Sequence, residues 1–223
     1  MNDDLQPAAA PRLRLLLVDD HRVVTEGLSL LLAPRFDVIG CLESGRALLD
    51  HAVALNPDVV VIDVSMPLLN GIDATRQLRR LVPSCKIVFL SMHSDTSYVA
   101  EAFRAGAHAY VLKRGPASEV VHAVKEAAAG RHYVSPLIAP DSADWVSSNE
   151  GDFLVTEHTL TTRQREVLQL VAEGKSMKEI AVSLNISVKT VEFHKTRIIH
   201  QLGLRTTAEL TKYAVAHGLT AVR

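Results

Sequence analysis

The chain has 223 residues and a mass of 24.3 kDa, which suits one large domain or two small ones. Hydrophobic residues make up 48% and charged residues 22%, which excludes a mainly disordered protein, and no apolar run reaches the ~18–20 residues that span a bilayer. The net charge of the whole chain is only −1, but the charges are unevenly distributed. Residues 159–223 hold ten Lys and Arg against five Asp and Glu, whereas residues 134–158 hold five Asp and Glu and no Lys or Arg. This contrast indicates modules with different partners.

The N-terminus and the cysteines indicate the compartment. The first residues, MNDDLQPAAAPR, are acidic and lack the apolar core of a secretory signal. Cys41 and Cys85 form no CxxC pair and have no His-rich partner, which argues against a disulfide or zinc scaffold. We therefore expect a cytoplasmic protein.

Residues 12–133 alternate short apolar runs with amphipathic stretches of helical length. The predicted strands are Leu13–Val18, Phe36–Gly40, Val59–Ile62, Ile87–Leu90 and Ala109–Leu112. The predicted helices lie near 22–33, 45–55, 71–81, 95–105 and 116–129. Five βα units in this order predict an α/β domain, a doubly wound parallel sheet with helices on both faces. Burial from both sides explains why a run such as VVVID does not alternate apolar with polar residues.

Residues 134–158 have the composition of a linker, and from residue 159 the pattern becomes all-helical. The predicted helices lie near 162–173, 177–184, 188–202 and 207–217. Capping boxes open three of them, at Thr161 with Gln164, Ser176 with Glu179, and Thr206 with Glu209. Left-handed helix ends are predicted at Gly174, Gly203 and Gly218. Only Asn185-Ile186-Ser187 separates the middle two helices, and this is the spacing of a helix-turn-helix.

Four of the predicted strands carry reactive side chains at their carboxyl ends, which is the edge where such sheets bind ligands. These side chains are Asp19 and Asp20, Asp63, Ser91, and Lys113. Clustered carboxylates favour a hard divalent cation such as Mg²⁺, and a carboxylate beside such a cation can attack phosphorus to form an aspartyl phosphate. Ser91 and Lys113 would then hold the phosphoryl oxygens. A single Asp is commonly a helix cap, as Asp20 could be for 22–33, but five such residues on four strands favour a site.

The motifs LLLVDD, VVVIDVSMPLLNG and AYVLK, together with Ser91, resemble a response-regulator receiver domain over residues 12–133. The spacing of Asp63, Pro67 and Gly71 belongs to this resemblance. It implies a flavodoxin-like (βα)5 fold in which a sensor histidine kinase phosphorylates Asp63.

The same resemblance assigns roles to the other residues of this edge. It implies that Mg²⁺ is held by Asp19, Asp20, Asp63 and the backbone carbonyl of Ser65. Ser91 and Tyr110 match the switch pair of the family, and Lys113 matches its phosphate-binding lysine. We expect Ser91 to close on the phosphoryl group and Tyr110 to follow it inwards.

On a helical wheel, residues 188–202 have one apolar and one polar arc. The apolar arc consists of Val188, Val191, Ile198, Ile199 and Leu202. Lys195 also lies towards this arc, so the wheel does not assign it a role in DNA binding. The opposite side carries Lys189, Phe193, Thr196, Arg197 and His200, with Thr190 and Glu192 flanking. Cations can bond guanine or phosphate, Glu can accept from cytosine, and Phe can contact a thymine methyl. An ordinary solvated face would carry similar charges, but the short turn and the local positive charge favour DNA.

The segment LTTRQREVLQLVAEGKSMKEIAVSLNISVKTVEFHKTRIIHQLGL closely resembles the four-helix DNA-binding domain of the NarL/FixJ (LuxR-type) regulators, over about 159–219. The resemblance implies that 188–202 is the recognition helix and that 207–217 is a dimerisation helix. The expected DNA contacts are Lys189, Thr190, Glu192, Phe193, Thr196 and Arg197.

Together these features predict a cytoplasmic two-component response regulator. We expect a receiver at 12–133, a linker at 134–158 and a LuxR-type helix-turn-helix domain at 159–223. Phosphorylation of Asp63 would control dimerisation and promoter binding and would free 188–202. The expected partners are a sensor histidine kinase, promoter DNA and a second copy of the chain. Apart from Mg²⁺-dependent self-phosphorylation and dephosphorylation at Asp63, no enzymatic activity is expected.

Three alternatives are disfavoured by particular features. Phosphatases of the haloacid-dehalogenase class use Asp-x-Asp, whereas Ser65 stands in the third position here. Sensors of acyl-homoserine lactones have aromatic-rich pockets, but only 4% of this chain is aromatic. A receiver that works without phosphate would not need the complete set of acidic-site residues.

Overall fold

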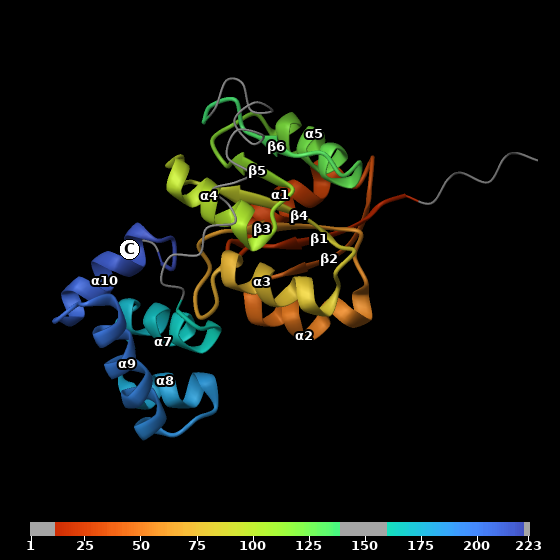
Figure 1. Cartoon of the computed structure of the whole chain (residues 1–223). Coiled ribbons are helices and arrows are strands. Elements are labelled where there is room, and N and C mark those ends of the chain that lie inside the picture. The colour runs from red at the N-terminus through yellow and green to blue at the C-terminus, as the bar shows by residue number, and fades with distance from the viewer. Residues whose placement is uncertain (1–11, 139–159, 221–223) are drawn as a thin grey trace, which may run out of the picture.

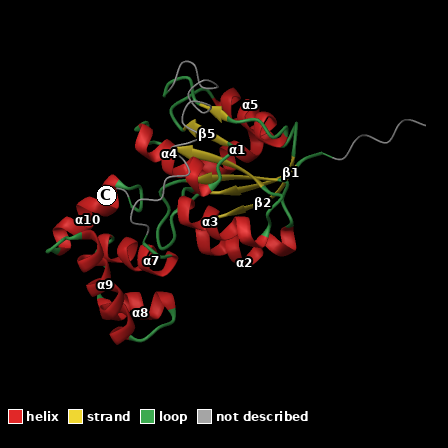
Figure 2. Cartoon of the chain, viewed as in Figure 1, coloured by secondary structure: helices red, strands yellow, loops and turns green. Residues whose placement is uncertain are grey.

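The computed structural model describes residues 12–138 and 160–220. An α/β domain precedes an all-helical domain, as the secondary structure in Figure 2 shows. Most of the predicted linker, and the acidic N-terminus, lie outside the described residues. Within them, no helix is long and apolar enough to cross a membrane.

The sheet of the first domain is entirely parallel, with strand order β2-β1-β3-β4-β5-β6. Its strands are β1 Arg14–Val18, β2 Asp37–Leu42, β3 Val59–Asp63, β4 Lys86–Ser91, β5 Ala109–Leu112 and β6 Tyr133–Val134. The predicted α/β fold is therefore confirmed. The sequence did not predict β6, a two-residue strand that pairs Tyr133 with Ala109.

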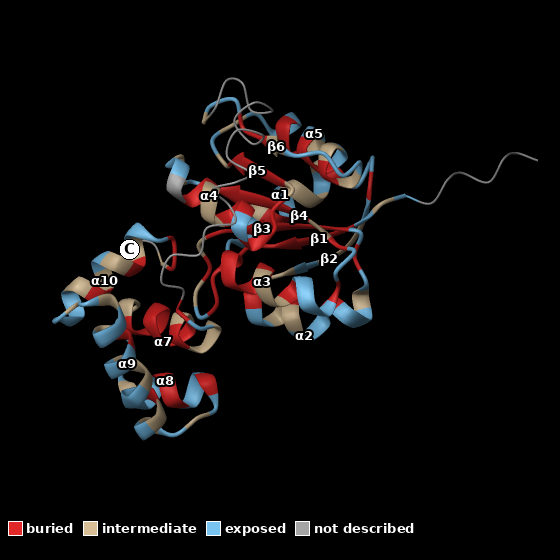
Figure 3. Cartoon of the chain, viewed as in Figure 1, coloured by how far each residue is buried: buried red, intermediate tan, exposed pale blue. Residues whose placement is uncertain are grey.

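Helices cover both faces of the sheet (Figures 1 and 3). They are α1 Arg22–Leu32, α2 Gly45–Leu55, α3 Gly71–Leu81, α4 Thr96–Ala105 and α5 Ala117–Ala128. Alternate side chains of β1 serve the two layers: Leu16 and Val18 pack in the cluster under α2, α3 and α4, whereas Leu15 and Leu17 pack under α1 and α5. Full burial of each such side chain contributes about 1.5–3 kcal/mol, which explains why the strands are apolar throughout.

The start of α3 is pressed against the end of β3. Asn70 caps the helix, because its side chain accepts a hydrogen bond from the Asp73 backbone at 2.8 Å. Gly71 follows, and a Cβ there would lie 2.1 Å from the Asp63 carbonyl oxygen, so only glycine fits. The spacing from Asp63 to Gly71 therefore has a structural cause: it brings α3 and its preceding loop next to Asp63.

The second domain consists of α7 Thr162–Ala172, α8 Met177–Leu184, α9 Val188–Leu202 and α10 Thr207–Ala216 around one apolar cluster. The three predicted capping boxes are all present. Gly174, Gly203 and Gly218 have positive φ as predicted, and Ser187 caps α9 by accepting from the Thr190 backbone at 3.1 Å. α8 and α9 thus form the predicted helix-turn-helix.

Candidate functional site: an acidic sheet edge and an exposed helix

The carboxyl edge of the sheet brings the predicted acidic residues together. Asp63 and Ser91 are the last residues of β3 and β4, while Asp19 and Lys113 directly follow β1 and β5. Asp19, Asp63 and Ser91 are buried. The ammonium of Lys113 lies 2.7 Å from Asp19 Oδ2 and 3.0 Å from Asp63 Oδ2. One cation thus bridges two carboxylates from neighbouring strands.

Burial and charge together set the protonation of this pair. Burial raises the pKa of Asp63, and the nearby Asp19 raises it further, although Lys113 acts in the opposite direction. Burial alone would lower the pKa of Lys113, but Asp63 and Asp19 outweigh it and raise that pKa. The Lys113 amine is therefore protonated at neutral pH, and it lies where it can bind an anionic group on Asp63.

The same edge contains a cluster of potential metal ligands. Atoms of Asp19, Asp20, His21 and Asp63 all lie within 4.8 Å of one another. Three carboxylates form the kind of oxygen donor set that suits Mg²⁺. The imidazole of His21 is 66% exposed, so it lies on the solvent side of this cluster. Its Nδ1 is 3.1 Å from a carboxylate oxygen of Asp19 and 3.1 Å from one of Asp20.

Sequence reasoning missed His21, although it directly follows the acidic pair. His21 also occupies the N-cap position of α1, so the alternative in which Asp20 caps that helix is wrong. The backbone of His21 instead donates to Asp19 Oδ1 at 2.9 Å.

The predicted switch pair is arranged around His93, in the loop after β4. Ser91 Oγ accepts from the His93 backbone, and the Tyr110 hydroxyl donates to the His93 carbonyl, both at 3.0 Å. The His93 ring lies 3.0 Å from Ser65 Oγ and stacks on Tyr98 with ring centroids 4.1 Å apart. Burial lowers the pKa of His93, so its ring is neutral at pH 7.

Tyr110 does not start in an outward position. Its side chain is fully buried, and burial strongly raises the pKa of its hydroxyl. The structure describes one conformation, in which the ring already lies inside, so the expected movement of Tyr110 on phosphorylation stays a prediction. A β5 side chain faces the helix layer by strand alternation, and the sequence could not show how deeply the layer covers it.

The polar face of α9 is open to solvent. Lys189, Glu192, Phe193, Thr196 and Arg197 are all exposed. Phe193 exposes 56% of its surface, and the Arg197 guanidinium lies 5.6 Å from the centre of its ring. The exposed face of α9 thus combines cations with an aromatic ring, the side chains that can contact phosphate, base edges and a thymine methyl.

Two other residues of α9 are engaged within the domain. Thr190 Oγ1 lies 2.8 Å from Ser187 Oγ in the helix cap, so its hydroxyl is less available than predicted. The Lys195 ammonium contacts Thr207 Oγ1 at 3.4 Å, which places it towards the start of α10 rather than on the open face.

The two domains are docked through α7 and the end of α10. Arg165 of α7 donates to Asp73 Oδ1 at 2.6 Å and lies 3.4 Å from Glu101 Oε1. At the far end of the contact, the Tyr98 hydroxyl donates to the Val215 carbonyl at 2.6 Å. None of these contacts was predicted from the sequence.

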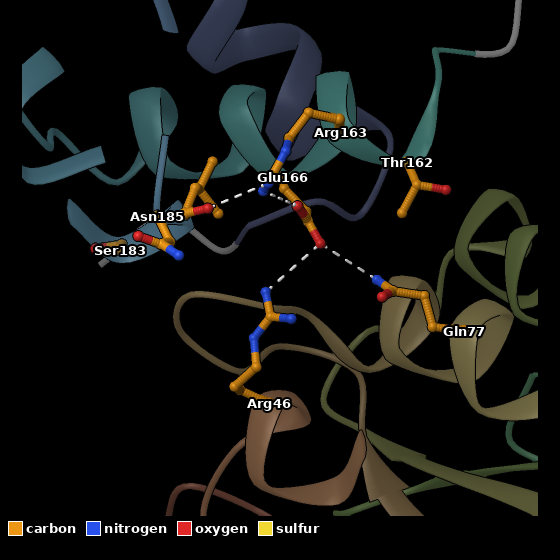
Figure 4. A pocket seen from close by; sticks show the side chains of 8 residues that line it. Arg46, Gln77, Thr162, Arg163, Glu166, Ser183 and Asn185 are labelled. Carbon is orange, nitrogen blue, oxygen red and sulfur yellow. Dashed lines mark hydrogen bonds and ion pairs between the residues drawn. The ribbon is translucent and has the colours of Figure 1, made fainter. Parts of the chain in front are cut away.

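Glu166 forms a second group of interdomain contacts beside a cavity of about 480 Å³ (Figure 4). Its carboxylate accepts from Arg163 of its own helix at 2.8 Å. It also points across the gap to Arg46 at 3.6 Å and to Gln77 at 3.3 Å. The docked face of α7 is therefore polar and hydrogen-bonded rather than apolar.

Comparison with known proteins agrees with this two-domain arrangement. Residues 15–125 match the family described as response regulator receiver domain, and residues 158–214 match bacterial regulatory proteins of the luxR family. The chain is 33% identical to the transcriptional regulatory protein DegU of Brevibacillus brevis and 35% identical to MctR of Rhizobium johnstonii, with 95% of this chain and 97% of each relative covered.

Among solved structures, the RcsB response regulator of Salmonella typhimurium has 25% identity and a TM-score of 0.63, covering 93% of this chain and 98% of that one. The predicted family is thus confirmed: the chain is a response regulator of the NarL/FixJ type, with a receiver domain followed by a LuxR-type helix-turn-helix domain.

Proposed function

We propose that Asp63 accepts a phosphoryl group from a sensor histidine kinase and that phosphorylation controls dimerisation and promoter binding through α9. The observation that carries this proposal is the buried Asp63 carboxylate, held 3.0 Å from the Lys113 ammonium at an edge with two further carboxylates. A cytoplasmic location gives both the kinase and the DNA access to the chain.

The chemistry assigned to these residues is a single phosphoryl transfer. An oxygen of Asp63 attacks phosphorus, the new P–O bond forms as the P–N bond of a phosphohistidine breaks, and the histidine nitrogen keeps the electron pair. The Lys113 ammonium binds a phosphoryl oxygen, and the Ser91 hydroxyl donates to another. Asp19, Asp20, Asp63 and the Ser65 carbonyl would hold Mg²⁺, which when bound offsets the negative charge of the phosphoryl oxygens. Attack of water on the same phosphorus returns free Asp63 and phosphate.

Incubation with a small phosphodonor and Mg²⁺ tests this assignment. The wild type should gain the mass of one phosphoryl group, and Asp63→Asn should gain none. Asp20→Asn should label more slowly, because the metal site loses a carboxylate. Asp50→Asn is the matched control, since Asp50 is exposed on α2 and does not belong to the cluster of potential metal ligands, and it should label like the wild type. Wild-type labelling of Asp63→Asn would contradict the proposal.

DNA binding as a dimer is proposed from the open face of α9 and from RcsB, whose dimers have been solved bound to DNA in a structure 25% identical to this chain, with a TM-score of 0.57. RcsB of Salmonella enterica serovar Typhimurium has been solved bound to promoter P1flhDC in the presence of the phosphomimetic BeF3⁻; it is 25% identical to this chain, with a TM-score of 0.58. Sedimentation of this chain with beryllofluoride and Mg²⁺ should show more dimer than without them. Identical distributions would count against phosphorylation-driven dimerisation.

A further inference from the structure

One side chain of the DNA-binding domain reaches the loop that follows the phosphoacceptor. Gln169, in the middle of α7, is fully buried. Its Oε1 accepts from the Asn70 backbone and from Asn70 Nδ2, both at 3.0 Å. Its Nε2 donates to the Met66 carbonyl at 3.0 Å and to Glu173 Oε1 at 2.8 Å. The amide is thus fully hydrogen-bonded, and three of its four bonds go to the receiver.

The segment that Gln169 holds is part of the acidic site. Residues 64–70 connect β3 to α3; they start directly after Asp63 and include Ser65. Within this loop Leu68 has a φ of +68°, a conformation that costs a non-glycine residue about 1–2 kcal/mol. The Leu68 backbone donates to Glu173 Oε1 at 3.3 Å, so α7 also supports this strained position. The docked domain therefore holds the loop at Met66, Leu68 and Asn70.

Glutamine is suited to this position because its amide both donates and accepts. A Glu side chain could still accept from Asn70 but would face the Met66 carbonyl with a negative oxygen. A Met side chain has a similar shape but would leave the Met66 carbonyl and the Asn70 N–H buried without this partner, at about 1–3 kcal/mol for each such group.

We propose that Gln169 is a positioning residue for the phosphorylation site: it holds the loop 64–70 in its resting conformation, so that domain docking and phosphorylation of Asp63 oppose each other. This inference rests on the proposed function. A phosphoryl group brings about −1.5 to −2 charges and three acceptor oxygens to an edge where Lys113 already bridges Asp19 and Asp63. The loop next to Asp63 shifts to admit the group, and the shift separates Met66 and Asn70 from Gln169.

Reciprocity makes this testable without any activity measurement. If docking opposes phosphorylation, a phosphoryl mimic must weaken docking by the same factor by which docking weakens binding of the mimic. Weakening the bonds of Gln169 must therefore strengthen binding of the mimic. Affinity for beryllofluoride at fixed Mg²⁺ can be measured by calorimetry on the full chain. Gln169→Met should tighten binding about 5-fold or more, within the usual range of coupling between sites. Gln169→Glu should act in the same direction, because it loses the donor to the Met66 carbonyl. The Asn70 amide should lose protection from hydrogen exchange in Gln169→Met, which removes its acceptor.

Two controls separate positioning from general stability. Gln164→Met makes the same substitution on the same helix, where the buried side chain bonds Thr161 and Gln201 within the DNA-binding domain. It should lower the melting temperature and leave beryllofluoride affinity unchanged. Tyr98→Phe removes the interdomain hydrogen bond to the Val215 carbonyl, which involves no residue of loop 64–70, and keeps the ring that stacks on His93. It should leave the Asn70 amide protected, with a smaller change in affinity than Gln169→Met.

Several results would overturn the inference. They are an affinity of folded Gln169→Met within 2-fold of wild type, weaker binding by that variant, or an equal gain with Gln164→Met or Tyr98→Phe. Failure of the proposed function looks different. In that case the wild type would not bind beryllofluoride with Mg²⁺, or Asp63→Asn would bind it equally well.

Discussion

Arg165→Ala should separate the two domains while leaving each one folded. Arg165 is largely buried between the domains, where its guanidinium meets Asp73 at 2.6 Å and Glu101 at 3.4 Å. Asp73 is only 1% exposed, so removing Arg165 leaves a carboxylate that water cannot easily reach. Truncating one partner of a buried, hydrogen-bonded ion pair costs about 2–5 kcal/mol. The lower end applies here, since Asp73 keeps its contact with Arg76 at 2.7 Å.

A loss of about 2 kcal/mol lowers the equilibrium constant for docking about 30-fold. Sedimentation velocity should then show a more extended particle, and the amides of loop 64–70 should exchange faster. Arg165→Lys is the matched variant, because it keeps the charge but not the planar group that reaches both carboxylates, and it should fall between Ala and the wild type. An Arg165→Ala chain with unchanged sedimentation and unchanged loop protection would refute the view that this ion pair holds the domains together.

Other predictions concern the acidic edge, the pH dependence of docking and the DNA face. Burial raises the pKa of Asp63, so its ionised form opposes folding, and Asp63→Asn should melt at a higher temperature than the wild type at pH 7 without Mg²⁺. This difference should shrink as pH falls through the raised pKa of Asp63 and vanish below its ordinary value of 3.8. Burial alone would raise the pKa of Glu101, but Arg76 and Arg165 outweigh it and lower that pKa from 4.5. Its contribution to docking should therefore be complete above about pH 4.5 and be lost as pH falls through the lowered pKa, which sedimentation in acidic buffers can measure. Lys189→Ala should weaken binding to all DNA sequences and reduce its salt dependence, whereas Phe193→Ala should change base preference by about 1–3 kcal/mol at one position in a binding-site selection.

The sequence predicted the features whose cause is local. The capping box at Thr161 lies within four residues, and the helix it starts follows from that spacing. The carboxyl-edge site was also predictable, because parallel strands present their ends at one edge whatever the details of packing. Gly71 shows the physical content of such a motif, since its missing Cβ lets α3 approach the Asp63 carbonyl.

The features that the sequence did not predict depend on how elements far apart in the chain pack against one another. Gln169 and Arg165 look like ordinary polar residues of a surface helix, and nothing in the spacing of α7 shows that receiver residues about 90–100 positions earlier cover them. β6 is too short for any periodic pattern to be seen. The depth of Tyr110 depends on how closely neighbouring elements pack, which alternation along a strand does not reveal.

The docked arrangement also changes where control of DNA binding can act. The sequence suggested that phosphorylation frees residues 188–202, but the DNA face of α9 is exposed while the domains are docked. The receiver instead holds α7 and the end of α10, where Tyr98 binds the Val215 carbonyl. The family resemblance gives α10 the role of dimerisation helix, and a helix-turn-helix dimer needs its two recognition helices about one DNA turn apart. We therefore propose that docking restrains the pairing of two chains on DNA rather than access of one recognition helix to a single half-site.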